Sequence, residues 1–386
     1  MIPLILMWDY INLVLGLLLL IYSPKGKNHP IDKQLTLWYI VFMLFIAVSS
    51  TWSISPKLTV FVLGVRVFPL FCLSFSLARY INSYNNLFHI LRLYYLSCII
   101  LFFFFLFFVD LTSIGEERLS VGEDLEKDWN LNCVAMEFAI AIYAGYFLFW
   151  KAKNNYYKRF WLIISAAMLV VIIITGSRKG FGFLLIPMVV FTLYEMKGHF
   201  IYAIGLSVIG IVFLYAIMTI PILYDTMGIR IKDMIDVASG TNDHTQDDSR
   251  MLLILAGWNW FLDNPIHGYG MNCFRVLSDN DILFMGKNWY AHNNYIEILV
   301  GGGIIGFLIY YSYLFLVIKR FKGHRDFPYK IVSVLLAILL FADMAQVGYY
   351  NPDLQFLLLL VFAILHLEEK KQDSHSFDLE SVQKVH

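Results

Sequence analysis

A histidine, two arginines and a carboxylate lie beside or just inside apolar runs of the chain. Arg178 sits in Thr-Gly-Ser-Arg-Lys-Gly between two such runs, and Arg250 follows a polar, turn-like stretch. His292 comes directly before an apolar run that contains Glu297. The arginine fork binds phosphate bidentately, and histidine is a natural general base near neutral pH. The arginines and the histidine fit attack by a hydroxyl group on a carbon whose leaving group is a diphosphate.

The two arginines each have a structural interpretation beside the functional one. Arg178 and Lys179 would snorkel to lipid headgroups from a short hairpin, although an arginine at membrane depth favours function. Arg250 would pair with a neighbouring aspartate, or would hold an anion at the N-terminus of its helix. The residues alone leave both interpretations open.

The composition restricts where these residues can work. Of the 386 residues, 59% are hydrophobic and 15% are charged, and the net charge is zero. A soluble chain carries about 25% charged residues, and aqueous cores stop growing near about 250–300 residues. An ordinary soluble enzyme and a disordered regulator are therefore excluded. Four cysteines do not define a disulfide framework. Basic residues do not outnumber acidic ones, which argues against nucleic-acid binding.

The excess apolar surface must face lipid, so the fold class is an all-α polytopic membrane protein. We expect about 11 (10–12) transmembrane helices, each of roughly 20 apolar residues. The candidate spans are 2–21, 35–50, 58–78, 87–109, 132–150, 160–175, 181–195, 200–224, 292–318, 331–348 and 354–367.

Basic residues predict the orientation of these spans. Alternate loops hold 17 of the 29 basic residues and the opposite set holds ten. The positive-inside rule then places the C-terminus in the cytoplasm and the N-terminus outside. We expect one integral membrane domain over 1–368, a long extracytoplasmic loop over 225–291, and a disordered cytoplasmic tail over 369–386.

The long outer loop contains one predicted short helix. Residues 250–262 are too few to span the membrane and hold two tryptophans, which indicates an interfacial helix. Ser249 would cap its start, and Asn264–Pro265 would stop it. His267–Gly270 would follow as a flexible turn.

Three histidines lie on the predicted outer side: His244, His267 and His292. His292 stands at a helix start beside Asn293, whereas the other two lie in exposed loops. A lone histidine is more often structural than catalytic, so position alone does not decide its role. Glu297 would orient a histidine or a ligand, or would pair with a buried arginine.

The sequence gives less support to a metal site or to a phosphate-binding loop. Asp243, Asp247 and Asp248 offer oxygens, but turn and cap chemistry explains them equally well. The glycines of 302–306 have the small-xxx-small spacing of helix packing, whereas phosphate loops follow strands. We expect no metal and no cofactor.

Several stretches, in their order along the chain, resemble one family, the O-antigen ligase and Wzy-type polysaccharide polymerase superfamily of multispan membrane glycosyltransferases. The resemblance covers roughly 110–310, and the combination is more specific than any single piece. The stretches are Thr175–Gly180; Arg250 with Asn264–Gly270; Ala291–Leu299 with Gly303–Gly306; and, weakly, Arg118 with Gly122 and Asn132.

The resemblance implies metal-independent glycosyl transfer from undecaprenyl diphosphate at the outer face of the bacterial cytoplasmic membrane. By carry-over, His292 becomes the base or an acceptor-positioning residue, and Arg178 and Arg250 become diphosphate clamps. The acidic segment 110–131 puts Arg118 in doubt. Candidate supporting residues are Arg118, Lys179, Asn293 and Glu297.

The sequence favours a polymerase of lipid-linked repeats, making O-antigen, capsule or exopolysaccharide. An O-antigen ligase, which transfers the glycan to lipid A core, stays open as the alternative. A flippase for the same lipid would need charged paths and broken helices in paired halves, for which there are few signs. Expected partners are the lipid-linked glycan, the bilayer, and a chain-length regulator and flippase of the same pathway.

Overall fold

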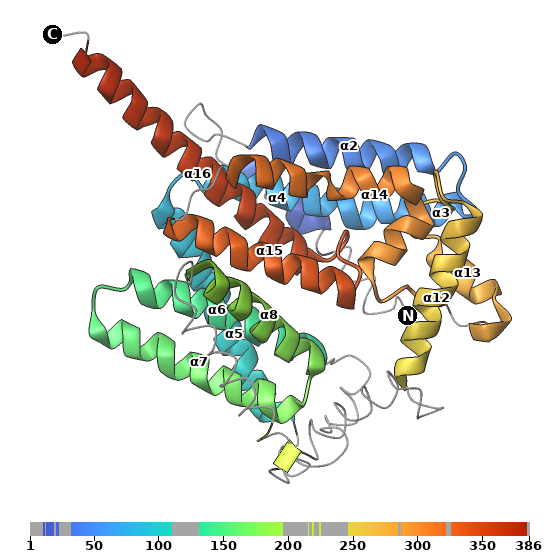
Figure 1. The fold of residues 1–386 in the computed structure, drawn as a ribbon, viewed down its shortest axis with the longest axis horizontal. Coiled ribbons are helices and arrows are strands. Elements are labelled where there is room, and N and C mark those ends of the chain that lie inside the picture. Colours follow the sequence, from blue (N-terminus) through green and yellow to red (C-terminus); the bar gives the residue numbers. More distant parts are fainter. Residues whose placement is uncertain are drawn as a thin grey trace. The chain divides into compact units, whose positions relative to one another are not determined.

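The computed structural model describes residues 32–109, 131–195, 246–284, 288–321 and 326–383, together with positions 11, 13–18, 21, 22, 215, 218, 219, 224 and 286. Over these residues the chain is built almost wholly from helices (Figure 1), as the predicted all-α class requires. Their contacts divide the chain into two compact units. Unit 1 is residues 1–87 with 248–386, and unit 2 is residues 88–247.

The chain is a multi-pass membrane protein. In the described part, six helical segments are long and apolar enough to cross a membrane, and α2 (Lys33–Ser49) is a shorter apolar helix. Predicted spans 2–21 and 200–224 fall largely outside the described residues, so the count of about 11 stays a prediction. The six segments are Pro56–Tyr80, Tyr84–Phe108, Leu131–Lys151, Asn155–Thr175, Asn294–Phe321 and Phe327–Ala345.

Unit 1 is held together by buried polar contacts between helices. α2 packs along α14 (Asn294–Phe321), and α15 (Phe327–Ala345) packs along α16 (Pro352–Gln383), as Figure 1 shows. The indole N–H of Trp38 donates to the carbonyl of Tyr310 at 2.9 Å. Such bonds fix neighbouring helices where apolar packing alone would let them slide.

One span of unit 1 contains a π-helical turn. It runs as α3 (Pro56–Phe61), η1 (Val62–Val67) and α4 (Phe68–Tyr80). Pro69 lacks an N–H and crowds the preceding turn, which gives a physical reason for the wider π geometry just before it. Arg66 lies inside this π-helical segment.

Helix α14 is interrupted at Gly303, and the loop that follows α12 fills the interruption. Gly303 has φ 60° and ψ −163°, a conformation essentially restricted to glycine. Four backbone groups near this break pair with residues 265–270, which satisfies them where water is scarce. The bonds are Tyr269 N–H to Val300 O (2.9 Å), Gly270 N–H to Gly301 O (2.8 Å), Ile304 N–H to Pro265 O (2.8 Å) and Ile305 N–H to Ile266 O (3.3 Å).

Gly268, Gly302 and Gly306 allow neighbouring segments of the chain to pack closely. A Cβ at Gly302 would lie 3.0 Å from the ring of Phe45, and one at Gly306 would lie 2.8 Å from it. The helix-packing interpretation is confirmed for these two glycines. A Cβ at Gly268 would lie 2.5 Å from the carbonyl oxygen of Val300. The prediction of a flexible turn at His267–Gly270 is wrong, because main-chain bonds to α14 fix it.

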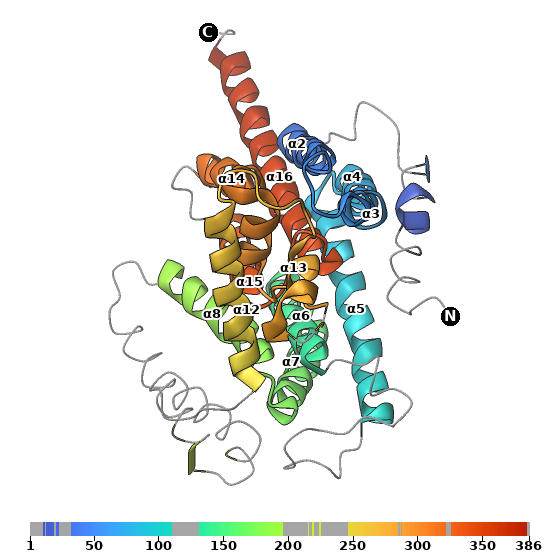
Figure 2. The ribbon, with the colours of Figure 1, turned by 90° about the vertical axis from the view of Figure 1, so that its right-hand side faces the viewer.

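Unit 2 contains most of α5 (Tyr84–Phe108), with α6 (Leu131–Lys151), α7 (Asn155–Thr175) and α8 (Arg178–Glu195). Helix α6 packs against both α7 and α8 (Figure 2). Close approach again depends on glycine: a Cβ at Gly180 would lie 2.6 Å from that of Ala135. Gly176 takes a left-handed conformation that ends α7, so the chain turns within two residues into α8.

Two helix boundaries differ from the prediction. Helix α12 runs from Gln246 to Asp263, so Ser249 lies inside it rather than capping it. Acidic residues at 247 and 248 favour the earlier start, because carboxylates stabilise a helix N-terminus. Helix α16 continues to Gln383, where a disordered tail was expected from 369. That segment is rich in glutamate, lysine and glutamine, which are good helix formers.

Candidate functional site in unit 1

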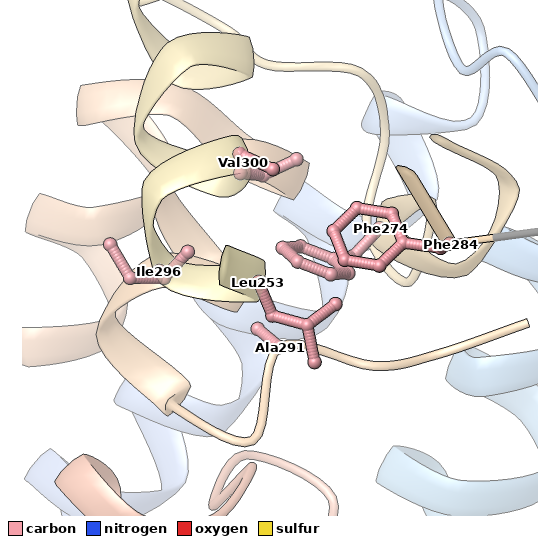
Figure 3. Packing of buried hydrophobic residues seen from close by; sticks show 7 residues of the cluster. Leu253, Phe274, Phe284, Ala291, Ile296 and Val300 are labelled. Carbon is pink, nitrogen blue, oxygen red and sulfur yellow. The ribbon is translucent and has the colours of Figure 1, made fainter. Parts of the chain in front are cut away.

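Apolar packing fixes the segment that leads into α14. Leu253 of α12, Phe274 of α13 (Phe274–Asn280) and Phe284 of η4 (Ile282–Phe284) meet Ala291, Ile296 and Val300 in one buried cluster (Figure 3). Ala291 is fully buried. The residue that follows, His292, is therefore anchored from its N-terminal side by a packed core.

His292 itself has an unusual backbone and a ring partner. Its φ is 51°, in the left-handed region that non-glycine residues seldom adopt. Its imidazole lies 3.9 Å from the ring of Tyr290, centroid to centroid, and 6.2 Å from that of Trp289. The side chain is half-buried. Strained backbone persists only where the surroundings impose it, and such positions gather at functional sites.

Glu297 imposes part of that geometry. Its Oε2 accepts the backbone N–H of Ala291 at 2.9 Å, and the side chain is 1% exposed. Its Oε1 accepts no hydrogen bond within the described part of the chain. Glu297 thus binds the residue before His292, and its predicted role of orienting a histidine or a ligand, or of pairing with a buried arginine, stays a prediction.

Two arginines are electrostatic partners of this carboxylate. Arg275 on α13 and Arg66 on η1 both interact electrostatically with Glu297. The Arg275 guanidinium lies 5.0 Å from the ring centre of Tyr290, and Tyr350 interacts with it electrostatically. Arg66 lies 4.8 Å from the ring centre of Tyr350. Both arginines are half-buried.

Burial and nearby charges determine the protonation states of Tyr350 and Arg275. Burial, followed by the charge of Glu297, raises the pKa of Tyr350 to about 12, so this phenol is neutral at pH 7. Burial lowers the pKa of Arg275, but Tyr350 and Glu297 outweigh that effect and leave it raised. Arg275 is thus a fixed cation.

The two asparagines after His292 stabilise the N-terminal start of α14. Asn293 accepts the N–H of Ile296 through Oδ1 at 3.1 Å, which is helix-capping geometry. Asn294 is fully buried and accepts the N–H groups of Gly348 and Tyr349 at 2.9 and 3.2 Å. Because Asn294 binds the backbone of the two residues before Tyr350, it helps to fix the position of Tyr350 relative to α14.

The predicted anion ligands lie on both units. Arg250 is exposed in the first part of α12, in unit 1. Arg178 is the first residue of α8 in unit 2, and Lys179 follows it; both are half-buried. The hydroxyl of Ser177 accepts the N–H of Gly180 at 3.2 Å, so it caps the helix that carries them. Arg118 and His244 lie outside the described residues.

None of the motif-bearing stretches includes Arg66, Arg275, Tyr290 or Tyr350. Arg275 stands between two motif-bearing stretches and belongs to neither. Its importance depends on contacts with residues far along the chain, which no local spacing indicates. In the part of the chain that the structure describes, no three His, Cys, Asp or Glu side chains gather into a metal-binding group.

Comparison with known proteins bears on the middle part of the chain. Residues 163–311 match a family model described as O-antigen ligase. The matched stretch runs from α7 to within α14 and includes Arg178, Arg250, Arg275, His292 and Glu297. No curated protein matches the chain.

Proposed function

We propose that the chain is a polymerase of surface polysaccharide, and the match of residues 163–311 to a family model described as O-antigen ligase supports the superfamily suggested by the sequence motifs. The enzyme joins oligosaccharide repeats carried on undecaprenyl diphosphate by glycosyl transfer at the outer face of the bacterial cytoplasmic membrane. The observation that carries the proposal is His292, which is held in a left-handed conformation directly after Ala291, whose backbone N–H the buried carboxylate of Glu297 accepts.

The proposed reaction is one displacement. The hydroxyl oxygen of the acceptor sugar attacks the anomeric carbon of the donor glycan, and the bond from that carbon to the diphosphate oxygen breaks. His292 takes the hydroxyl proton as general base. The electron pair of the broken bond leaves with undecaprenyl diphosphate, and fixed cations stabilise the charge that grows there.

Each predicted residue has a role in this scheme. Arg178 and Arg250 bind the diphosphate, with Lys179 in support. Glu297 positions the segment of His292, and Asn293 supports the start of the same helix. Arg118 remains a weaker candidate. The half-buried position of Arg178 at a capped helix start suits an anion ligand, since a helix N-terminus itself attracts anions.

An O-antigen ligase, which would use the same donor chemistry with lipid A core as acceptor, is the second candidate, and the description of the matched family as O-antigen ligase favours it. One specific observation favours a flippase: helix α14 is interrupted at Gly303. Broken helices line transport paths. Here, however, the freed backbone groups pair with residues 265–270, which favours a fixed structural joint.

The proposed setting follows from the orientation prediction. The start of α14 and the residues around His292 lie outside, and the C-terminus is cytoplasmic. A chain-length regulator and a flippase of the same pathway are the proposed protein partners.

A gene deletion analysed on a glycan gel tests the proposal. Loss of a polymerase leaves surface glycans of a single repeat. Loss of a ligase leaves unsubstituted core and accumulated carrier-linked polymer, and loss of a flippase leaves glycan on the cytoplasmic side. An unchanged glycan pattern would contradict all three functions.

A further inference from the structure

Trp289 is an aromatic side chain that stays accessible next to the candidate base. It is 37% exposed, and its ring centroid lies 6.2 Å from that of His292. Tyr290, the residue between Trp289 and Ala291, lies closer to the imidazole, at 3.9 Å, but is half-buried. An indole presents a large flat apolar surface, and leaving it in water costs free energy. Trp289 is therefore a candidate contact for a substrate that reaches His292.

The backbone of Trp289 is held by one buried hydroxyl group. The Oγ of Ser278 accepts the N–H of Trp289 at 3.0 Å. The same hydroxyl group donates to the carbonyl oxygen of Trp289 at 2.9 Å or to that of Arg275 at 3.0 Å. Ser278 is fully buried in α13. Because these contacts involve only the main chain of Trp289, they hold position 289 in place whatever side chain it carries.

The same segment is held a second time before it reaches His292. Ala291 is fully buried in the apolar cluster of Figure 3, and Glu297 accepts its N–H at 2.9 Å. Trp289 and His292 thus belong to a stretch of chain that is fixed at two points, which restricts the separation of their rings. A binding surface that needs no rearrangement loses less entropy when its ligand arrives.

The composition of this stretch favours a sugar over a lipid tail as the occupant. Asn288, which is exposed, precedes Trp289, and His292 and Asn293 follow. Polar side chains are costly against hydrocarbon. A pyranose ring, by contrast, has an apolar face of C–H groups bordered by hydroxyl groups. An indole buries that apolar face and leaves the hydroxyl groups at its border able to form hydrogen bonds.

We propose that Trp289 is the stacking surface of a sugar subsite that binds the acceptor glycan, with one pyranose ring on the indole beside His292. The inference rests on the proposed function, in which His292 takes the proton of the acceptor hydroxyl group. It adds a specificity-determining residue to that scheme. Stacking requires a ring face without axial hydroxyl groups, so the subsite selects sugars that have such a face.

Binding of free oligosaccharides tests the subsite without requiring turnover. One probe is a repeat-length oligosaccharide prepared by partial acid hydrolysis of the surface polysaccharide, and the other is core oligosaccharide released from lipopolysaccharide by mild acid. Each is titrated calorimetrically into the purified full-length protein in detergent. We expect Trp289→Ala to weaken the affinity roughly tenfold, the upper end for one aromatic contact. Trp289→Phe should lose less, because it keeps an aromatic face, whereas Trp289→Leu should resemble Trp289→Ala.

Trp150→Ala is the matched control, since Trp150 is a tryptophan that is 61% exposed near the end of α6, in unit 2. Unchanged affinity in Trp150→Ala with weakened affinity in Trp289→Ala supports the subsite. Weakening for the repeat oligosaccharide assigns the subsite to the acceptor of a polymerase. Weakening for the core oligosaccharide alone assigns it to the acceptor of a ligase.

Four outcomes overturn the inference: no saturable binding of either probe to the wild-type protein, wild-type affinity in Trp289→Ala, equal weakening in Trp150→Ala, or wild-type affinity in Trp289→Leu. The last result would make Trp289 an apolar membrane anchor, because leucine keeps apolar surface without a flat ring. If Trp289→Ala does not fold, equal affinity of the Phe and Leu variants counts against the subsite, and higher affinity of the Phe variant supports it. Failure of the proposed function would appear separately, as an unchanged glycan gel in the deletion strain.

Discussion

Glu297 accepts the backbone N–H of Ala291 at 2.9 Å across the turn that begins α14. A side chain that is 1% exposed thereby holds the residue directly before His292, whose own φ is 51°. The helix and the left-handed residue stabilise each other, since the carboxylate belongs to the first turn of α14. The position of the candidate base is thus set by a residue that need not contact the substrate.

Replacing Glu297 should separate its hydrogen bond from its charge. We expect Glu297→Ala to lower glycan transfer about 10–100-fold, the value of a lost hydrogen bond to a charged group. Glu297→Gln keeps an acceptor oxygen and should retain more activity than Glu297→Ala. The measurement is polymer length on a glycan gel, with protein level determined in parallel. Equal activity in both variants and the wild type would refute the positioning role.

His292→Ala should remove polymer from the gel while leaving expression and membrane insertion intact. Loss of a general base costs about 10²–10⁴-fold in rate. His267→Ala is the control, because His267 is an exposed histidine in a neighbouring loop of the same unit. Near-normal polymer in His292→Ala would end the catalytic assignment.

Arg178→Lys should also damage transfer, by about tenfold or more, since a point charge replaces a bidentate fork. The same exchange at Arg159 serves as control, because Arg159 is exposed near the opposite end of α7. Glycan gels of the two strains give the comparison. Full activity in Arg178→Lys would favour the interpretation that this arginine snorkels to headgroups.

Hydropathy predicted most of the described helices, because a lipid-facing helix must carry a long apolar run wherever it lies in the fold. The motif glycines were harder to interpret. Gly302 and Gly306 do pack against Phe45, as their spacing indicated. Gly303 instead breaks the helix, and nothing local distinguishes it from its neighbours, since the break depends on the backbone of residues 265–266.

The candidate site shows the same division between local and distant signals. His292 and Glu297 lie five positions apart, so the sequence alone could suggest a relation between them. Arg275 joins them only because Tyr290 and Tyr350 lie beside it, and Tyr350 is far along the chain. Such contacts come from packing, which residue spacing does not encode.

Gly303→Ala should destabilise the protein by more than about 2 kcal/mol, because the backbone region is essentially closed to other residues. A Cβ there would also lie 2.3 Å from the carbonyl oxygen of Ile266. Gly286→Ala is an informative control: Gly286 also has a positive φ, of 70°, but open space around it. Thermal unfolding in detergent should rank the variants, and equal midpoints would contradict the joint at Gly303.

Arg320→Ala should cost about 3 kcal/mol, near the lower end of the range for breaking a buried ion pair. Arg320 donates to Asp32 at 2.6 Å, and both side chains are less than a tenth exposed. Asp32 also accepts the N–H groups of Gln34 and Leu35, each at 2.9 Å, so it keeps part of its stabilisation. Removing Arg320 leaves this buried carboxylate without its cation and loosens the start of α2.

The neighbouring Lys319 provides the control for this pair. Lys319 is exposed, so Lys319→Ala removes the same charge without leaving a buried carboxylate and should shift the unfolding midpoint little. Arg320→Ala should also retain glycan transfer once folded, because Arg320 lies at the far end of α14 from His292. Equal midpoints in Arg320→Ala and Lys319→Ala would show that the Asp32–Arg320 pair adds no stability, since both variants lose one positive charge and only one of them loses the buried contact.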